Sequence, residues 1–253
     1  MVVMKKRFVN VILFIILLCL IVILVVSVKN IYDWFKDNKK TKEMVEVIED
    51  NTNIEEITDD EEKGLINVDL NDLRSINGDT IGYIKVNNTN ISYPVVQTTD
   101  NSFYLSHTFD KSVNKAGWVF MDYRNHNNDF DTNTILYAHG RLDNTMFGSL
   151  RKVIKEEWYT NSDNHIIQYS NDHYSTKWQV FSIYRVKETD DYIKVGFKSE
   201  GEYQQFIDMI KGRSIYDFGV DISTNDKVIT LSSCYNDTER MVLHAKLIKI
   251  VEK

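Results

Sequence analysis

The sequence predicts a mainly β-structured domain with peripheral helices, preceded by an N-terminal transmembrane helix. Three observations lead to this fold class. A long apolar run occupies the N-terminal region, about eight short β-type runs separated by turn-rich segments follow it, and only two longer helical patterns interrupt the strands. That number of short strands is typical of a closed barrel or a sandwich.

Composition limits the class of protein further. The chain has 253 residues, of which 43% are hydrophobic and 12% aromatic, with ten glycines and one proline. These values exclude collagen-like and wholly disordered chains. Cys19 and Cys234 are the only cysteines, which excludes a disulfide-stapled scaffold. The net charge of −7 argues against a basic surface for phosphates, so we expect no nucleic-acid partner.

The N-terminal residues predict a basic tail and a membrane anchor. Residues 1–7 carry three positive charges, and residues 8–28 contain only Asn10 and Ser27 as polar members. At 1.5 Å per residue this run spans the ~30 Å hydrocarbon core of a bilayer. The run is longer than the core of a signal peptide and no small-residue cleavage site follows it, so we expect an uncleaved signal-anchor. Positive charges on both sides leave its orientation undecided.

Residues 29–64 are interpreted as an acidic linker. The net charge is +6 over residues 1–42, −9 over 43–63 and −4 over 64–253. Six of the eight residues from 55 to 62 are acidic. Because like charges repel one another, we expect an extended, solvated spacer rather than a docking segment.

Residues 65–253 are predicted to form the globular domain. Leu70, Leu73 and Ile76 predict a short helix that the turn at 77–79 ends. Strands are predicted, in order, over residues 81–86, 91–97, 117–123, 134–138, 165–169, 177–186, 227–232 and 241–251.

Two further helices interrupt these strands. The first is expected over 147–154, with Asp143 or Asn144 as its N-cap. The second is expected over 199–212, where Ser199 and Glu202 have the spacing of a capping box. Apolar residues at helical spacing follow that box and Gly212 ends the pattern.

Cys234 is the side chain best suited to chemistry. It ends an apolar strand pattern, where a side chain can leave the core and face a cleft. If the domain faces outward, this is its only thiol, so the thiol is either buried and inert or reactive. An unperturbed thiol pKa of about 8.5 leaves little thiolate at neutral pH, so a nucleophilic cysteine needs a base or a positively charged neighbour.

His139 is the best candidate for that base, and His244 is the second. His139 follows an apolar run and precedes Gly140, at a predicted strand end. Alternation puts His244 opposite the apolar face of its strand, which predicts a solvent-facing or partly covered residue. The remaining histidines are expected to be ordinary surface residues: His107, His126, His165 and His173.

Arg240 is the third candidate. It follows Cys234 by six residues, across a turn between two predicted strands. A hairpin of that length could bring the guanidinium beside the sulfur, where it would favour the thiolate and stabilise an oxyanion. The alternative is a strand-edge arginine paired with Asp237 or Glu239.

These residues together resemble the sortase signature. Thr230-Leu231-Ser232-Ser233-Cys234 followed by Arg240 is similar to the TLxTC motif with its downstream arginine, with Ser233 in place of the usual threonine. Residues 135–139 resemble the strand that delivers the sortase histidine. Further segments are similar to class B sortases, as is the position of the helix at 199–212: residues 80–84, 93–97, 120–125 and 144–147.

The resemblance covers about residue 65 to the end and implies an eight-stranded sortase-type β-barrel. It also implies a membrane-held cysteine transpeptidase with a cytoplasmic N-terminus and an extracytoplasmic catalytic domain on a Gram-positive cell. Cys234 would be the nucleophile, His139 the general acid and base, and Arg240 the group that stabilises the substrate and the oxyanion. The substrate would be a surface protein whose C-terminal NPxTx-type sorting motif is cleaved after threonine through a thioester. The acceptor would be an amine of a lipid II-type peptidoglycan precursor, and we expect no cofactor and no metal.

The same resemblance implies six groove residues that bind the substrate: Asn101, Leu105, Tyr137, Tyr192, Ile193 and Ser232. Glu188 stands where a groove threonine is expected. Two other functions stay open from the residues alone. One is a hydrolytic cysteine peptidase that uses the same three residues with water, and the other is a non-catalytic, membrane-anchored binding or scaffold domain in which Cys234 is buried and unreactive.

Overall fold

The N-terminal apolar run lies within one long helix, α1 (Val2–Asp50). The computed structural model describes residues 2–57, 64–234 and 238–253, and the chain divides into two units, over residues 1–43 and 44–253. From Phe8 onward α1 is long and apolar enough to cross a membrane, with a mean hydropathy of 3.7 over 18 residues, none of them buried. The helix is therefore a candidate membrane span.

The structure differs from the predicted extended spacer. α1 remains helical to Asp50, and β1 (Ile54–Glu56) pairs antiparallel with β2 (Ile66–Val68). At the end of α1, Met44, Val45 and Ile48 pack against the core of the second unit. Burial of this apolar helix face outweighs the repulsion between neighbouring acids. Four of the acids, at positions 59–62, lie outside the described residues.

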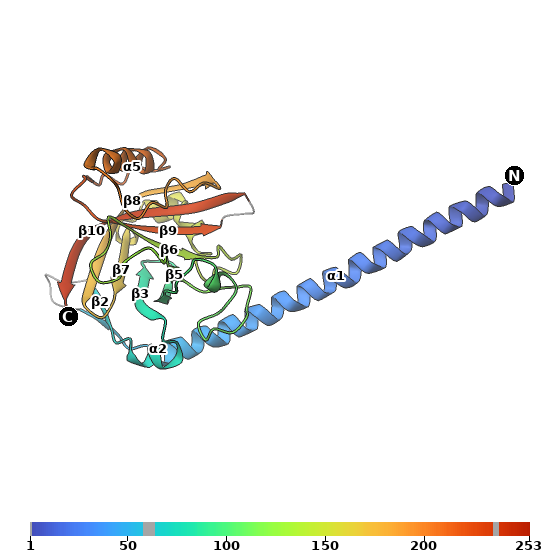
Figure 1. Ribbon diagram of the computed structural model, residues 1–253, viewed down its shortest axis with the longest axis horizontal. Coiled ribbons are helices and arrows are strands. Elements are labelled where there is room, and N and C mark those ends of the chain that lie inside the picture. The colour runs from blue at the N-terminus through green and yellow to red at the C-terminus, as the bar shows by residue number, and fades with distance from the viewer. Residues whose placement is uncertain (1, 58–63, 235–237) are drawn as a thin grey trace. The chain divides into compact units, whose positions relative to one another are not determined.

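Eight strands close into a barrel, which confirms the predicted fold class (Figure 1). Its order is β10-β8-β7-β3-β4-β5-β6-β9. The pairs β4–β5 and β6–β9 are parallel and the other pairs are antiparallel. The strands are β3 (Thr80–Val86), β4 (Ser92–Val96), β5 (Phe120–Met121), β6 (Asn133–Ala138), β7 (Ile166–Ser170), β8 (Tyr174–Lys187), β9 (Val228–Cys234) and β10 (Glu239–Glu252).

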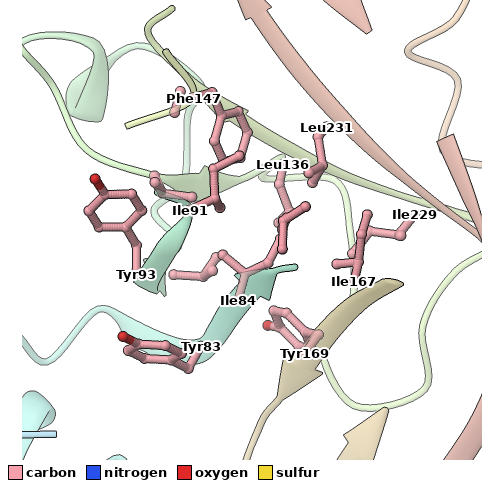
Figure 2. Packing of buried hydrophobic residues seen from close by; sticks show 14 of the residues in the cluster. Tyr83, Ile84, Ile91, Tyr93, Leu136, Phe147, Ile167, Tyr169, Ile229 and Leu231 are labelled. Atoms are coloured by element: carbon pink, nitrogen blue, oxygen red, sulfur yellow. The ribbon is translucent and has the colours of Figure 1, made fainter. Parts of the chain in front are cut away.

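The barrel core is filled by apolar side chains from strands that are distant in the sequence. Figure 2 shows Ile84 of β3 lying near Leu136 of β6, and Ile167 of β7 near Ile229 of β9. All four side chains are fully buried. Because the sheet closes on itself, its strands leave no long unpaired edge.

The helices agree in part with the sequence pattern. α2 (Asn71–Ile76) forms where it is predicted. α5 (Glu200–Gly212) begins at Ser199, whose hydroxyl accepts a hydrogen bond from the backbone N–H of Glu202 at 3.2 Å. Two short 3-10 turns, η1 (Phe103–Leu105) and η2 (Ser162–Asn164), complete the set.

The single helix expected over 147–154 is wrong. Two one-turn helices form instead, α3 (Leu150–Val153) and α4 (Glu156–Tyr159), with Lys155 in an extended conformation between them. Asp143 caps no helix, because its carboxylate accepts hydrogen bonds from the backbone and hydroxyl of Thr145 in the preceding turn.

α5 covers the outer face of the barrel over β8 and β10 (Figure 1). Phe206, Ile207 and Ile210 pack there against Phe181 and Tyr184. Both faces of these strands are therefore buried, and a residue on the outer face does not meet solvent.

The predicted exposure of His244 is wrong for this reason. Its side chain is fully buried beneath α5, with Nε2 2.9 Å from the hydroxyl of Tyr184 and Nδ1 2.8 Å from that of Thr230. His165 is not a surface residue either. It is buried beside Trp158 and Phe218, which form an aromatic cluster around it.

Burial lowers the pKa of His244 to about 3, and the charge of Arg213 acts in the same direction. The unfolded chain takes up a proton near pH 6.5 that the folded chain excludes, so stability from this residue is complete above that pH and falls below it. We expect wild type to lose about 1.5–2 kcal/mol of unfolding free energy from this residue between about pH 6.5 and pH 5. Denaturant unfolding of the full chain in detergent, followed by tryptophan fluorescence, measures this loss. His244→Gln should show a flatter pH dependence, and equal slopes would contradict the prediction.

Candidate active site

A groove of about 560 Å³ lies where three barrel strands begin or end. Its walls come from the segment around η1, the end of β6, the end of β9, the start of β10 and the segment that follows β8. All nine residues that the sequence indicates for catalysis and substrate binding line this groove: Asn101, Leu105, Tyr137, His139, Tyr192, Ile193, Ser232, Cys234 and Arg240.

Strand pairing brings Cys234 and Arg240 together. Cys234 is the last residue of β9, and in the antiparallel β9–β10 pair it lies directly opposite Arg240. Side chains opposite each other in such a pair have Cβ atoms about 4.5–5.5 Å apart. The predicted hairpin is therefore present, although residues 235–237 of its turn lie outside the described residues. Cys234 is partly exposed and free of any disulfide.

His139 reaches the same point from the other side of β9. β6 runs parallel to β9 with Ala138 opposite Ser233, so His139 follows β6 at the level of Cys234. Its Nε2 lies 2.8 Å from the backbone carbonyl of Leu105. A carbonyl only accepts hydrogen bonds, so Nε2 carries the proton and Nδ1 is the ring atom left for proton transfer.

Two glycines make room for this arrangement. A Cβ on Gly140 would lie 1.8 Å from the carbonyl oxygen of Cys234, far inside van der Waals contact. Gly117 has φ +62°, and a Cβ there would lie 2.5 Å from the carbonyl oxygen of Tyr104 and 3.0 Å from the His139 ring. Any larger residue at either position would displace the histidine strand or the loop that holds the imidazole.

Arg240 is paired, but with neither of the partners considered from the sequence. Its guanidinium forms an ion pair with the carboxylate of Glu188, which follows β8 at the rim of the groove. The Arg240 side chain is 20% exposed and that of Glu188 is 67% exposed. Glu239 contributes only a weak backbone contact at 3.5 Å, and Asp237 lies outside the described residues.

A buried carboxylate behind the groove holds three parts of its wall. Asp122 is fully buried and accepts hydrogen bonds from Asn101 at 3.0 Å and from the Tyr137 hydroxyl at 2.9 Å. Arg124 donates to it at 2.7 Å and also donates to the backbone carbonyl of Ile193 at 3.0 Å. Burial opposes ionisation of Asp122, but the hydrogen bonds outweigh burial and hold its pKa below the ordinary value.

Sequence reasoning did not identify this role of Asp122. An acid just after a short strand is most often a surface residue, and only its place in the class B-like segment 120–125 sets it apart. A second anchor of the wall was also missed. The Tyr192 hydroxyl lies 2.9 Å from that of Ser232, which joins the segment after β8 to the β9 strand.

No other histidine joins the site. His107 stacks on Phe103, His126 lies beside Asp131, and His244 is buried under α5. Within residues 2–57, 64–234 and 238–253, no group of three His, Cys, Asp or Glu side chains is arranged to hold a metal ion.

Comparison with known proteins identifies the family. Residues 84–248 match the model of the sortase domain. The chain is 34% identical to sortase B of Staphylococcus aureus over 182 residues, which cover 70% of this chain and 74% of the relative. It is 32% identical to sortase B of Listeria monocytogenes over 191 residues, covering 73% and 76%.

Solved structures agree with this result. A sortase B from Bacillus anthracis superposes with a TM-score of 0.71 at 32% identity, covering 86% of this chain and 98% of that one. A Staphylococcus aureus sortase B–substrate complex superposes with a TM-score of 0.66 at 38% identity, covering 70% and 83%. The chain therefore belongs to the sortase family of cysteine transpeptidases and, within that family, to class B.

Proposed function

We propose that this transpeptidase cleaves an NPxTx-type sorting motif after its threonine and joins the surface protein to an amine of a lipid II-type peptidoglycan precursor. The observation that carries the proposal is the meeting of Cys234, His139 and Arg240 at one end of a groove large enough for an extended peptide. The substrate complex of a sortase B at 38% identity supports a peptide substrate for this groove as well.

The first half of the reaction forms a thioester. The Cys234 thiolate attacks the carbonyl carbon of the motif threonine, and the electron pair of the C=O bond moves to oxygen. The Arg240 guanidinium donates hydrogen bonds to that oxyanion. When the carbonyl re-forms, the C–N bond breaks and the imidazolium of His139 gives a proton to the leaving amine.

The second half transfers the acyl group. The acceptor amine attacks the thioester carbon, the neutral imidazole of His139 takes one amine proton, and the C–S bond breaks to return the Cys234 thiolate. Because Leu105 holds the Nε2 proton, Nδ1 is the atom that carries the transferred proton in both halves. A single imidazole thus serves first as acid and then as base.

The position of the enzyme follows from α1. We propose that residues 8–28 cross the membrane, with residues 1–7 in the cytoplasm and the catalytic domain outside the cell. A tether of this kind concentrates the active site near lipid-bound acceptors and near substrates that emerge across the membrane.

The test uses the full chain in detergent micelles with a fluorescent NPxTx peptide, with and without triglycine as the amine. We expect cleavage after threonine and, with triglycine, a product that contains the amine. Cys234→Ala and His139→Ala should abolish both products. A product formed only with water at every amine concentration would identify a hydrolytic peptidase and overturn the transfer step.

Arg240→Lys tests the oxyanion role. An ammonium cannot reproduce the planar fork of a guanidinium, so kcat/KM for the peptide should fall about 10²-fold or more. Arg74→Lys is the matched control, because Arg74 forms a comparable two-pronged pair with Asp172 outside the groove. Near-normal rates for Arg240→Lys would remove this residue from the mechanism.

Glu188→Thr tests whether the Glu188 carboxylate competes with the substrate for Arg240. Releasing a partly exposed ion pair costs up to about 1 kcal/mol, so the variant should raise kcat/KM by up to about fivefold. The gain should shrink at high salt, which screens the pair in wild type. Glu56→Thr is the control, since Glu56 is equally exposed at 69% and pairs with Lys85 away from the groove. A fall in kcat/KM for Glu188→Thr would show that the carboxylate assists Arg240 instead.

A further inference from the structure

A chain of buried hydrogen bonds runs from beneath α5 to the wall of the groove. The Tyr184 hydroxyl lies 2.9 Å from Nε2 of His244, and Nδ1 of His244 lies 2.8 Å from the Thr230 hydroxyl. Thr230 donates to Oδ1 of Asn133 at 2.6 Å. These side chains come from β8, β10, β9 and β6, and all four residues are at most 1% exposed.

The chain ends on the backbone of the groove wall. The amide nitrogen of Asn133 donates to the carbonyls of Tyr192 at 3.4 Å and Lys194 at 2.9 Å. Between these two residues lies Ile193, and both Tyr192 and Ile193 line the groove. The wall segment, residues 190–194, belongs to no strand or helix, so side chains and not a sheet ladder fix its position.

Each hydrogen bond in the chain fixes the direction of the next. Two carbonyls face the Asn133 nitrogen, so its Oδ1 must face Thr230 and accept. Thr230 then donates its only hydrogen to Oδ1, and its oxygen must accept from His244 Nδ1–H. Nε2 of His244 is left without a proton and accepts from the Tyr184 hydroxyl. One protonation state, the neutral Nδ1–H form of His244, satisfies every member.

The start of the chain is tied to the same wall. Arg213, which follows α5, lies over the Tyr184 ring at 5.8 Å and forms two hydrogen bonds with Asp191, at 2.8 and 2.6 Å. The wall segment is therefore held at Asp191 from one end and at Tyr192 and Lys194 from the other. Buried networks of this kind rigidify a structure when every donor and acceptor is satisfied.

We propose that Tyr184, His244, Thr230 and Asn133 are positioning residues that fix the wall segment and thereby set the affinity for the sorting motif. The inference rests on the proposed function only in taking the sorting motif as the occupant of the groove. His244 is then a structural link and not a second catalytic base. Its burial keeps the imidazole neutral across physiological pH, so the direction of the chain does not reverse there.

The first test compares Thr230→Val with Thr176→Val in the full chain. Both threonines are fully buried and each hydroxyl makes two hydrogen bonds, but Thr176 bonds to Tyr169 and Trp178, away from the groove. Thr230→Val should raise KM for the NPxTx peptide about tenfold with little change in kcat, because the wall shifts while Cys234 and His139 stay in place. Thr230→Ser keeps the hydroxyl and should restore KM. Thr176→Val should change neither constant, even where it lowers thermal stability by as much.

The second test does not depend on activity. Nitrogen-15 NMR of histidine-labelled full-length protein should show one imidazole in the Nδ1–H form that does not titrate between about pH 5 and pH 8. Its signal should be lost in His244→Gln. Hydrogen exchange measured by mass spectrometry should rise over the segment 188–197 in Thr230→Val and stay unchanged there in Thr176→Val.

The outcomes separate this inference from the proposed function. An Nε2–H form of His244, or equal effects of the two valine variants on KM and on exchange, would overturn the positioning role. If wild type does not process the NPxTx peptide, the proposed function fails, and the NMR and exchange results still decide whether the chain holds the wall.

Discussion

The parallel pairing of β6 with β9 is the contact on which the active site depends. Parallel neighbours end at the same edge of a sheet, so the histidine that follows β6 and the cysteine that ends β9 emerge side by side. The antiparallel partner of β9 begins at that edge and supplies Arg240. A slip of one residue in the β6–β9 register would turn every side chain of one strand to the opposite face, so the packed core also protects the chemistry.

The histidine shows how strongly local packing constrains this site. One ring nitrogen is held by the Leu105 carbonyl, and the strand carrying the ring passes so close to Cys234 that only glycine fits at position 140. Such constraints select one tautomer and one approach direction before any substrate binds. Preorganisation of this kind removes the need for rearrangement when charge develops on the oxyanion.

Much of the fold could be predicted because barrel strands have a strong local signal. Alternation and turn residues located all eight strands, and the motif around Cys234 indicated the three groups that meet in the groove. The signal fails where a distant segment changes the environment. His244 looks like a solvent-facing strand residue until α5 covers it, and nothing in its own strand encodes that cover. Asp122 fails in the same way, because its role comes from partners at positions 101, 124 and 137.

The two sides of the groove are built by different means, and this has a consequence for how such a site can vary. Strand ends carry the reacting groups, and their positions are fixed by the backbone ladder of the barrel. The wall at 190–194 is held by side chains, through Asn133, Arg124 and Arg213. A substitution among those side chains, or at Glu188 beside them, can reshape recognition without moving the strands that carry Cys234 and His139. Recognition can therefore diverge between class B members while the acyl-transfer geometry stays constant.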